Sequence, residues 1–119
     1  MDLEDLEVYK LAKEVSGKAW SIYQEMDYQT KRILGSQFIQ AADSIGANIA
    51  EGFGRYHYLD KNKFNYNARA SLSESLYWLD LLLERKIIDK KDASYLKKKL
   101  KNLAIKLNNY ITFTKKQIK

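Results

Sequence analysis

The sequence has 119 residues, 45% of them apolar, and a formal net charge of +6, which is typical of one compact domain over residues 1–119. It contains no cysteine, which excludes disulfide scaffolds, thiolate nucleophiles and cysteine-ligated zinc. The longest run without a charged residue, 33–42, is much shorter than the roughly 20 apolar residues of a membrane-spanning helix.

The chain begins with acidic residues and lacks the basic-then-apolar order of a signal peptide. We therefore expect a soluble, cytoplasmic protein. Proline is absent and only five glycines occur, which favours long helices because β-rich folds need many turns.

The positive charge lies near the C-terminus. Residues 86–119 hold eleven lysines against two acidic residues, a balance of +9, and residues 1–85 carry ten basic and thirteen acidic residues, a balance of −3.

The first predicted helix runs from Leu3 or Glu4 to about Met26. Apolar residues recur there every three or four positions, as on one face of an α-helix. They are Val8, Ala12, Val15, Ala19, Ile22 and Met26. Thr30, in the link that follows, is expected to be the N-cap of the second helix.

The second predicted helix carries two neighbouring stripes and ends at two glycines. The apolar stripe is Phe38, Ala42, Ile45 and Ile49, and the small, polar stripe is Gln37, Ala41, Ser44, Asn48 and Glu51. Gly52 and Gly54 are expected to supply the positive φ that a helix C-terminus prefers. The helix dipole disfavours a carboxylate at this end, so we expect Glu51 to be compensated by Arg55, by Arg69 or by free N–H groups of the third helix.

Two interpretations of the end of this helix are open. Asn48, Glu51 and Arg55 are interpreted first as a packing and capping device, in which Asn48 bonds neighbouring backbone and fixes the turn. The alternative is a site for a phosphate or a partner.

The third predicted helix starts at Asp60, as its N-cap, and ends near Arg85. Eight of the twelve residues in 72–83 are apolar or aromatic, which is more than one face of a helix holds. We therefore expect another subunit to cover a second face. The candidate oligomer contacts are Tyr77, Trp78, Leu81 and Leu82.

The fourth predicted helix is capped by Asp89, and Asp92 lies in its first turn, where the helix dipole favours negative charge. Its apolar stripe is Leu96, Leu100, Leu103, Leu107 and Tyr110. Short links join the four helices. The pattern predicts an all-α, antiparallel up-down-up-down four-helix bundle, assembled as a homo-oligomer.

The stretch QFIQAADSIGANIAEGFGR, residues 37–55, resembles the signature of the 23S ribosomal RNA intervening-sequence proteins. DLEVYKLAKEV resembles the first helix of that family, and ARASLSESLYWL resembles its third. The matching motif residues are Gln37, Ser44, Asn48, Glu51, Gly52, Arg55, Ser71 and Glu74. The resemblance covers nearly the whole chain. It implies a small bacterial four-helix bundle that forms homopentamers and has no established catalytic residue.

The same resemblance bears on nucleic acids. A related branch of the family binds nucleic acid and a reverse transcriptase. This chain departs from the family pattern at Gln40, Ala70 and Ser75, where arginine, glycine and leucine are common. The first departure removes a basic residue from the second helix and weakens any RNA-binding hypothesis that rests on that face.

No catalytic, cofactor or metal site can be assembled from the residue pattern. His57 is the only histidine, too few for a histidine-based metal site. The glycines match neither a P-loop nor a dinucleotide-binding fingerprint. We expect a protein that is not an enzyme and that uses no metal or cofactor.

Two groups of residues are candidates for contact with RNA or DNA. Lysines of the fourth helix would meet phosphates, and the aromatic and basic run after residue 54 would stack on unpaired bases. These residues are Lys97, Lys98, Lys101 and Lys106, and Arg55, Tyr56 and Tyr58. A solvated lysine face and tyrosines at an oligomer interface explain the same residues. The leading hypothesis is an oligomeric nucleic-acid-binding or scaffolding accessory. The alternative is a protein–protein adaptor or a structural oligomer with no nucleic-acid role.

Overall fold

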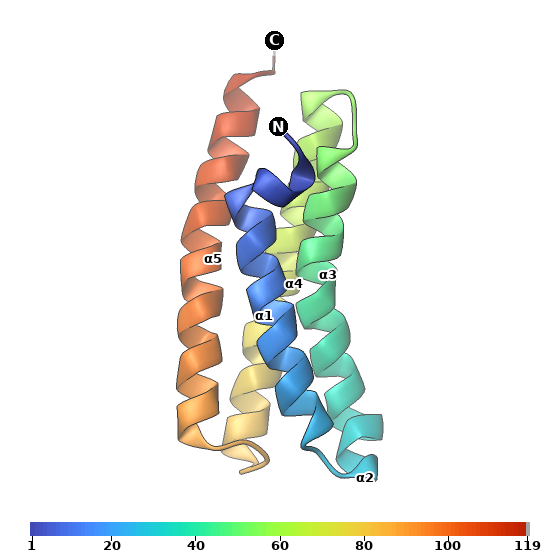
Figure 1. The fold of residues 1–119 in the computed structure, drawn as a ribbon, viewed down its shortest axis with the longest axis vertical. Helices are drawn as coiled ribbons and strands as arrows, with labels where there is room; N and C mark the ends of the chain where they lie inside the picture. Colours follow the sequence, from blue (N-terminus) through green and yellow to red (C-terminus); the bar gives the residue numbers. More distant parts are fainter. Residues whose placement is uncertain (119) are drawn as a thin grey trace.

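The computed structural model describes residues 1–118, and every regular element in that range is helical. The elements are η1 (Leu3–Asp5), α1 (Glu7–Gln24), α2 (Tyr28–Thr30), η2 (Lys31–Gly35), α3 (Ser36–Phe53), α4 (Tyr58–Glu84) and α5 (Lys90–Lys116). Figure 1 shows the four long helices, α1, α3, α4 and α5, lying lengthwise beside one another, each reversing the direction of the one before it. The predicted all-helical fold is confirmed as a bundle of four long helices. None of the helices within residues 1–118 has a stretch apolar enough to span a bilayer.

The core lies along the axis of this bundle and is built from the predicted apolar stripes. The stripe of α3 is fully buried at Phe38, Ala42, Ile45 and Ile49, and that of α5 is fully buried at Leu96, Leu100, Leu103 and Leu107. The predicted stripe of α1 is also buried, from Val8 to Ile22. Spacing of three and four residues therefore identified the core of these helices correctly.

Two of the predicted helix caps are wrong and one is confirmed. Asp27, not Thr30, caps the second helical segment: its Oδ1 accepts a hydrogen bond from the Thr30 N–H at 2.8 Å, and this bond lowers the pKa of Asp27. The N-cap of α4 is His57, so Asp60 lies in the first turn of that helix. Asp89 does cap α5, because its Oδ1 accepts from the Asp92 N–H at 2.7 Å.

Gly52 and Gly54 do not have the positive φ that was expected of them, since no glycine in residues 1–118 does. Gly52 is buried where the end of α3 meets the start of α4. A Cβ at this position would lie 2.9 Å from the Lys61 carbonyl oxygen and 3.0 Å from the Phe64 Cβ. Gly52 therefore allows α4 to approach α3 closely. The left-handed conformation occurs instead at Lys86, just after α4, with a φ of 58°.

The apolar residues of α4 occupy more than one face of the helix because α4 packs against two helices, α3 and α5. Leu82 is only 1% exposed and belongs to the core, so its prediction as an oligomer contact is wrong. Trp78 and Leu81 are half-buried, and Tyr77 is 57% exposed. A single chain thus covers most of the apolar surface for which a second subunit was expected.

Polar side chains in the core are the feature that the apolar pattern did not predict. Asn62 and Asn65 are buried in α4. The Nδ2 of Asn62 donates to the Ile111 carbonyl at 3.1 Å, and the Nδ2 of Asn65 donates to the Oδ1 of Asn62 at 3.0 Å. The Oδ1 of Asn65 has no hydrogen-bond partner within the described residues. This pair ties α4 to α5 inside the bundle.

Candidate nucleic-acid interface

The seam between α1 and α5 is electrically balanced. Three ion pairs cross it: Lys106 Nζ to Glu7 Oε1 at 3.4 Å, Lys99 Nζ to Glu14 Oε1 at 3.5 Å, and Lys18 Nζ to Asp92 Oδ1 at 2.8 Å. The hydrogen bond from Lys18 to Asp92 raises the pKa of Lys18. Lysines on this flank of α5 therefore already have partners in the chain.

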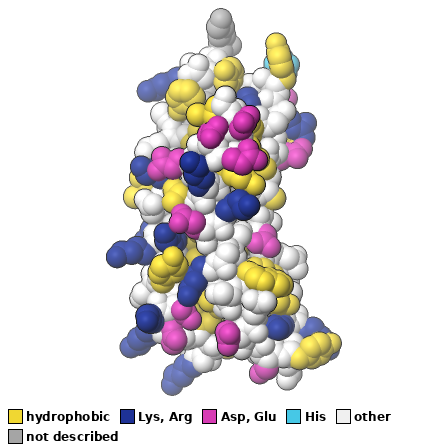
Figure 2. Space-filling model, viewed as in Figure 1, with side chains coloured by type: hydrophobic (Ala, Val, Ile, Leu, Met, Phe, Trp, Pro, Cys, Tyr) yellow, Lys and Arg dark blue, Asp and Glu magenta, His cyan; other side chains and the backbone are white. Residues whose placement is uncertain are grey.

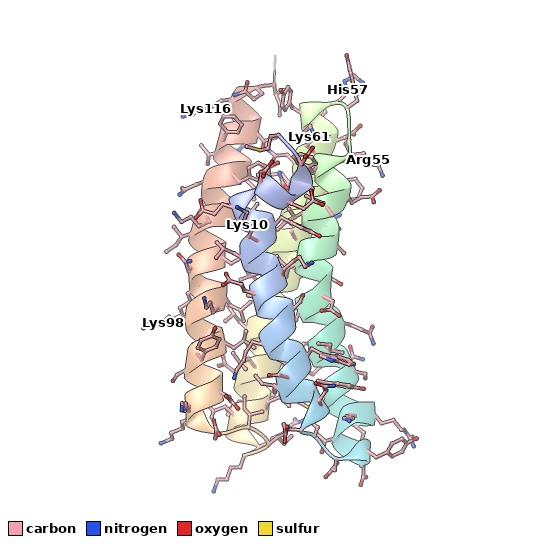
Figure 3. All side chains as sticks on the ribbon, in the orientation of Figure 1. Lys10, Arg55, His57, Lys61, Lys98 and Lys116 are labelled. Carbon is pink, nitrogen blue, oxygen red and sulfur yellow. The ribbon has the colours of Figure 1, made fainter. Side chains whose placement is uncertain are left out.

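The four lysines predicted to meet phosphates fall into two classes. Lys97 lies 3.7 Å from Asp80 of α4, measured from Nζ to Oδ1, and Lys106 pairs with Glu7. Lys98 and Lys101 are exposed, and no carboxylate of residues 1–118 lies within 4.0 Å of either Nζ. Figure 3 shows Lys98 projecting away from the bundle.

Other lysines of α5, beyond those that the prediction named, are also exposed without a carboxylate partner in the described residues. The exposed lysines without a carboxylate partner in the described chain are Lys90, Lys91, Lys98, Lys101, Lys115 and Lys116, and we call them the α5 lysines. They are spread over a helix of 27 residues, which is about 40 Å long at 1.5 Å per residue. Lys119, which contributes to the predicted charge of this segment, lies outside the described residues.

The second predicted group, Arg55, Tyr56 and Tyr58, lies at one end of the bundle. Tyr56 is 88% exposed and Tyr58 is also exposed. Arg55 has intramolecular partners: its Nη2 lies 2.7 Å from Glu51 Oε1, and its guanidinium lies 4.6 Å from the centre of the Phe64 ring.

The structure does not bring the two groups together. Figure 3 shows Arg55 and His57 at the upper end and Lys98 much lower, on the opposite side. Lys116 does reach the upper end (Figure 3). It follows Lys98 by 18 residues, or about 27 Å of helix, so α5 connects the two groups.

The motif residues of α3 and α4 make mostly local contacts. Of the three partners considered for Glu51, the structure shows Arg55, but an exposed pair four residues apart contributes only about 0.3–0.5 kcal/mol. Asn48 donates to the Ser44 carbonyl at 2.8 Å within α3, so it does not fix the turn. Glu74 accepts from the Trp78 indole N–H at 3.2 Å.

The other motif positions follow the same pattern. Gln37 is exposed at the start of α3, and the Ser71 carbonyl accepts from the Ser75 hydroxyl at 2.8 Å within α4. Packing between α3 and α4 therefore depends on Gly52 more than on the polar motif residues.

The surface of the bundle has several open hollows. The cavity at the lower end, of about 470 Å³, lies between the end of α1 and the link from α4 to α5 and is lined by Ser21, Ile22, Glu25, Met26, Ile87, Ile88, Asp89 and Asp92. Within residues 1–118, no three histidine, cysteine or acidic side chains are grouped as metal ligands. The His57 ring contacts Tyr56 edge-on, with 4.9 Å between ring centres.

Comparison with known proteins identifies a matching family and a similar solved structure. Residues 4–109 match the family model described as 23S rRNA-intervening sequence protein. Among solved structures, a similar one is a protein of unknown function from the S23 ribosomal protein family of Bacteroides thetaiotaomicron. It is 22% identical, the match covers 87% of this chain and 97% of that one, and the TM-score is 0.82. That likeness supports the fold. No curated protein matches the chain.

Proposed function

The chain belongs to the 23S rRNA-intervening sequence protein family, and from this premise we propose that it is a non-enzymatic, self-associating helical bundle that binds RNA through its backbone phosphates. The family resemblance predicted from residues 37–55 is confirmed by the match. We propose that it acts in the cytoplasm. A role as a protein–protein adaptor without RNA is the alternative that the experiments below separate.

The observation that carries the proposal is the segregation of charge on α5. Its flank toward α1 is neutralised by Glu7 and Glu14, whereas Lys98 and Lys101 are exposed without such partners. The free ammonium groups form two clusters, Lys90 to Lys101 and Lys115 with Lys116, spread over about 40 Å of helix, and such an arrangement attracts a polyanion of comparable length. Lysines are compact charges that meet phosphate oxygens without reading bases. The expected binding is therefore independent of sequence and falls steeply with salt.

Charge reversal tests this surface. The double substitution Lys98→Glu and Lys101→Glu is expected to weaken RNA binding about tenfold or more at low salt. It should also reduce the slope of log K against log salt by about 1–2, since each lost phosphate contact removes about 0.7–0.9. Filter binding of a structured RNA between 50 and 200 mM salt, roughly the range over which such contacts change most, measures both quantities.

A matched double variant separates position from net charge. Lys10 and Lys13 are exposed on α1, and Lys10→Glu with Lys13→Glu changes the net charge by the same amount. The proposal requires this control to bind RNA better than the α5 variant. Equal losses would assign the effect to overall charge, and undiminished RNA binding by the α5 variant would leave the adaptor alternative.

Self-association is the second part of the proposal, and its support is the surface of α4. Trp78 and Leu81 are half-buried beside the exposed Tyr77, whose ring lies 5.1 Å from that of Trp78. We propose a homopentamer, as the family resemblance implies, which would multiply the charge of +6 per chain.

Light scattering is expected to give about five times the chain mass of 13.9 kDa. Tyr77→Glu should lower that mass, while Tyr28→Glu, at another exposed tyrosine, should not. A single species of the chain mass at high concentration would refute self-association.

A further inference from the structure

Large apolar side chains are exposed together at the end of the bundle where α3 connects to α4. Tyr56 is 88% and Leu59 is 64% exposed, and Tyr58 and Ile118 are exposed as well. A shallow hollow of about 510 Å³ lies between this connection and the C-terminal end of α5. It is lined by His57, Tyr58, Leu59, Asp60, Gln117 and Ile118. We call these residues, with Tyr56, the end platform.

Among residues 1–118, no ring or cation stacks on the face of Tyr56 or Tyr58, which is also true of Tyr28 but not of Tyr23 or Tyr95. Tyr23 stacks on Trp20 with 5.3 Å between ring centres. Tyr95 has the ammonium groups of Lys18 and Lys99 within 5.2 and 5.6 Å of its ring centre. In residues 1–118, Tyr56 has only the edge-on contact with His57, and no ring or cation lies over Tyr58. A flat apolar group from outside can therefore lie on either ring.

Free cations lie at the same end of the bundle as the platform. Lys115 and Lys116 are exposed at the end of α5, and Lys63 is exposed in α4. None of the three has a carboxylate within 4.0 Å among the described residues. Figure 3 places Lys116 and His57 on opposite sides of the same end of the bundle. Lys61 is occupied, because its Nζ donates to the Phe53 carbonyl at 2.9 Å.

The acidic residues are distributed differently. Among residues 1–118, Asp60 is the one carboxylate that lines the hollow. In Figure 2 the acidic side chains of the upper part gather over the N-terminal turn and the start of α1, below the tip where His57 lies. A ligand that joins a flat apolar group to an anion fits this arrangement of free rings and free ammonium groups. Nucleotides have that composition, with a base to stack and a phosphate to neutralise.

We propose that the end platform binds unpaired nucleotides, with bases stacked on Tyr56 and Tyr58 and phosphates contacting Lys115 and Lys116. This inference rests on the proposed RNA binding and adds a preference for single strands, because bases inside a duplex do not expose their faces. From Lys98 to Lys116, the α5 lysines extend over about 27 Å of helix. A strand held along α5 therefore ends at the platform.

Removal of one ring tests the platform. Tyr56→Ala is expected to bind a fluorescein-labelled oligoadenylate about tenfold more weakly in fluorescence anisotropy, as loss of one stacking partner usually does. Its affinity for a blunt RNA duplex of the same length should not change. The slope of log K against log salt should also not change, since no phosphate contact is lost. Tyr56→Phe keeps the ring and should bind like the unmodified protein.

Tyr28→Ala is the matched control, because Tyr28 is 77% exposed and lies in α2, at the opposite end of the bundle (Figure 1). It should leave both affinities unchanged. If Tyr56→Ala weakens duplex and single strand equally, or weakens neither, the platform does not select unpaired nucleotides and the inference fails. If Tyr56→Ala has no effect while Lys98→Glu with Lys101→Glu weakens both RNAs, the platform is refuted and the proposed function stands. If the unmodified protein binds neither RNA, both are refuted.

Discussion

Gly52→Ala is expected to destabilise the protein by up to about 2 kcal/mol, even though alanine is the better helix former. The added Cβ would lie 2.9 Å from the Lys61 carbonyl oxygen and 3.0 Å from the Phe64 Cβ. A backbone oxygen and a Cβ cannot rotate away, so α4 must shift relative to α3. This overpacking outweighs the gain of about 1 kcal/mol that alanine brings to a helix interior. Urea unfolding followed by circular dichroism measures the difference.

Two other helical glycines provide controls, because their substitution by alanine is expected to raise stability instead of lowering it. A Cβ at Gly17 would meet nothing within 4 Å, and one at Gly46 would meet only the Ala12 Cβ at 3.5 Å, an ordinary contact. Gly17→Ala and Gly46→Ala are therefore expected to stabilise the protein by up to about 1 kcal/mol each. Stabilisation by Gly52→Ala as well would show that close approach of α3 and α4 does not require this glycine.

The glycine also shows where sequence reasoning is limited. The pattern correctly placed a helix end near residue 52, since Gly54 is the C-cap residue of α3. It assigned the wrong physical reason, positive φ, because the actual reason is contact with Lys61 and Phe64. That contact exists only once α4 has folded back against α3. A local motif can indicate that glycine is required without indicating what surrounds it.

The same distinction explains the core and the caps. Leu96, Leu100 and Leu103 were predicted correctly because burial in a bundle repeats with the period of the helix itself. Asp27 and Thr30 are both good N-cap residues three positions apart, and only the path of the backbone decides that Asp27 accepts the hydrogen bond. Leu82 was misplaced because its face of α4 is covered by neighbouring helices, which composition does not specify.

Only part of the candidate interface could be predicted, because the pairing of its charges depends on residues distant in sequence. The lysine richness of α5 is visible in the sequence, and so is the run that contains Tyr56. Which lysines are neutralised is decided by neighbours distant in sequence: Lys97 meets Asp80 and Lys106 meets Glu7. The separation of Arg55 from Lys98 follows from helix length and direction (Figure 3), and the sequence alone did not place them at different heights.

Asn62→Leu is expected to cost about 1–3 kcal/mol of stability, because it removes the only hydrogen-bond partner that the buried Asn65 amide has within residues 1–118. The Asn65 Oδ1 already lacks a partner in the described chain. Leucine has the same branching as asparagine and fits the same core. Urea unfolding monitored by tryptophan fluorescence gives the free energy, and near-ultraviolet circular dichroism reports whether packing stays specific.

The double variant Asn62→Leu with Asn65→Leu should reverse this loss. It removes both amides at once, including the unpartnered oxygen, and the Ile111 carbonyl that accepts from Asn62 lies within α5, where helix N–H groups also serve it. Its stability is expected to match or exceed that of the unmodified protein, so the two substitutions are strongly non-additive. If the Asn62–Asn65 pair lowers the stability of the bundle, its role is to fix how α4 packs against α5. Single buried asparagines have this role in coiled coils. We therefore expect the double variant to lose near-ultraviolet signal while its midpoint rises. Equal losses in the single and double variants would refute this role and assign the effect to overpacking alone.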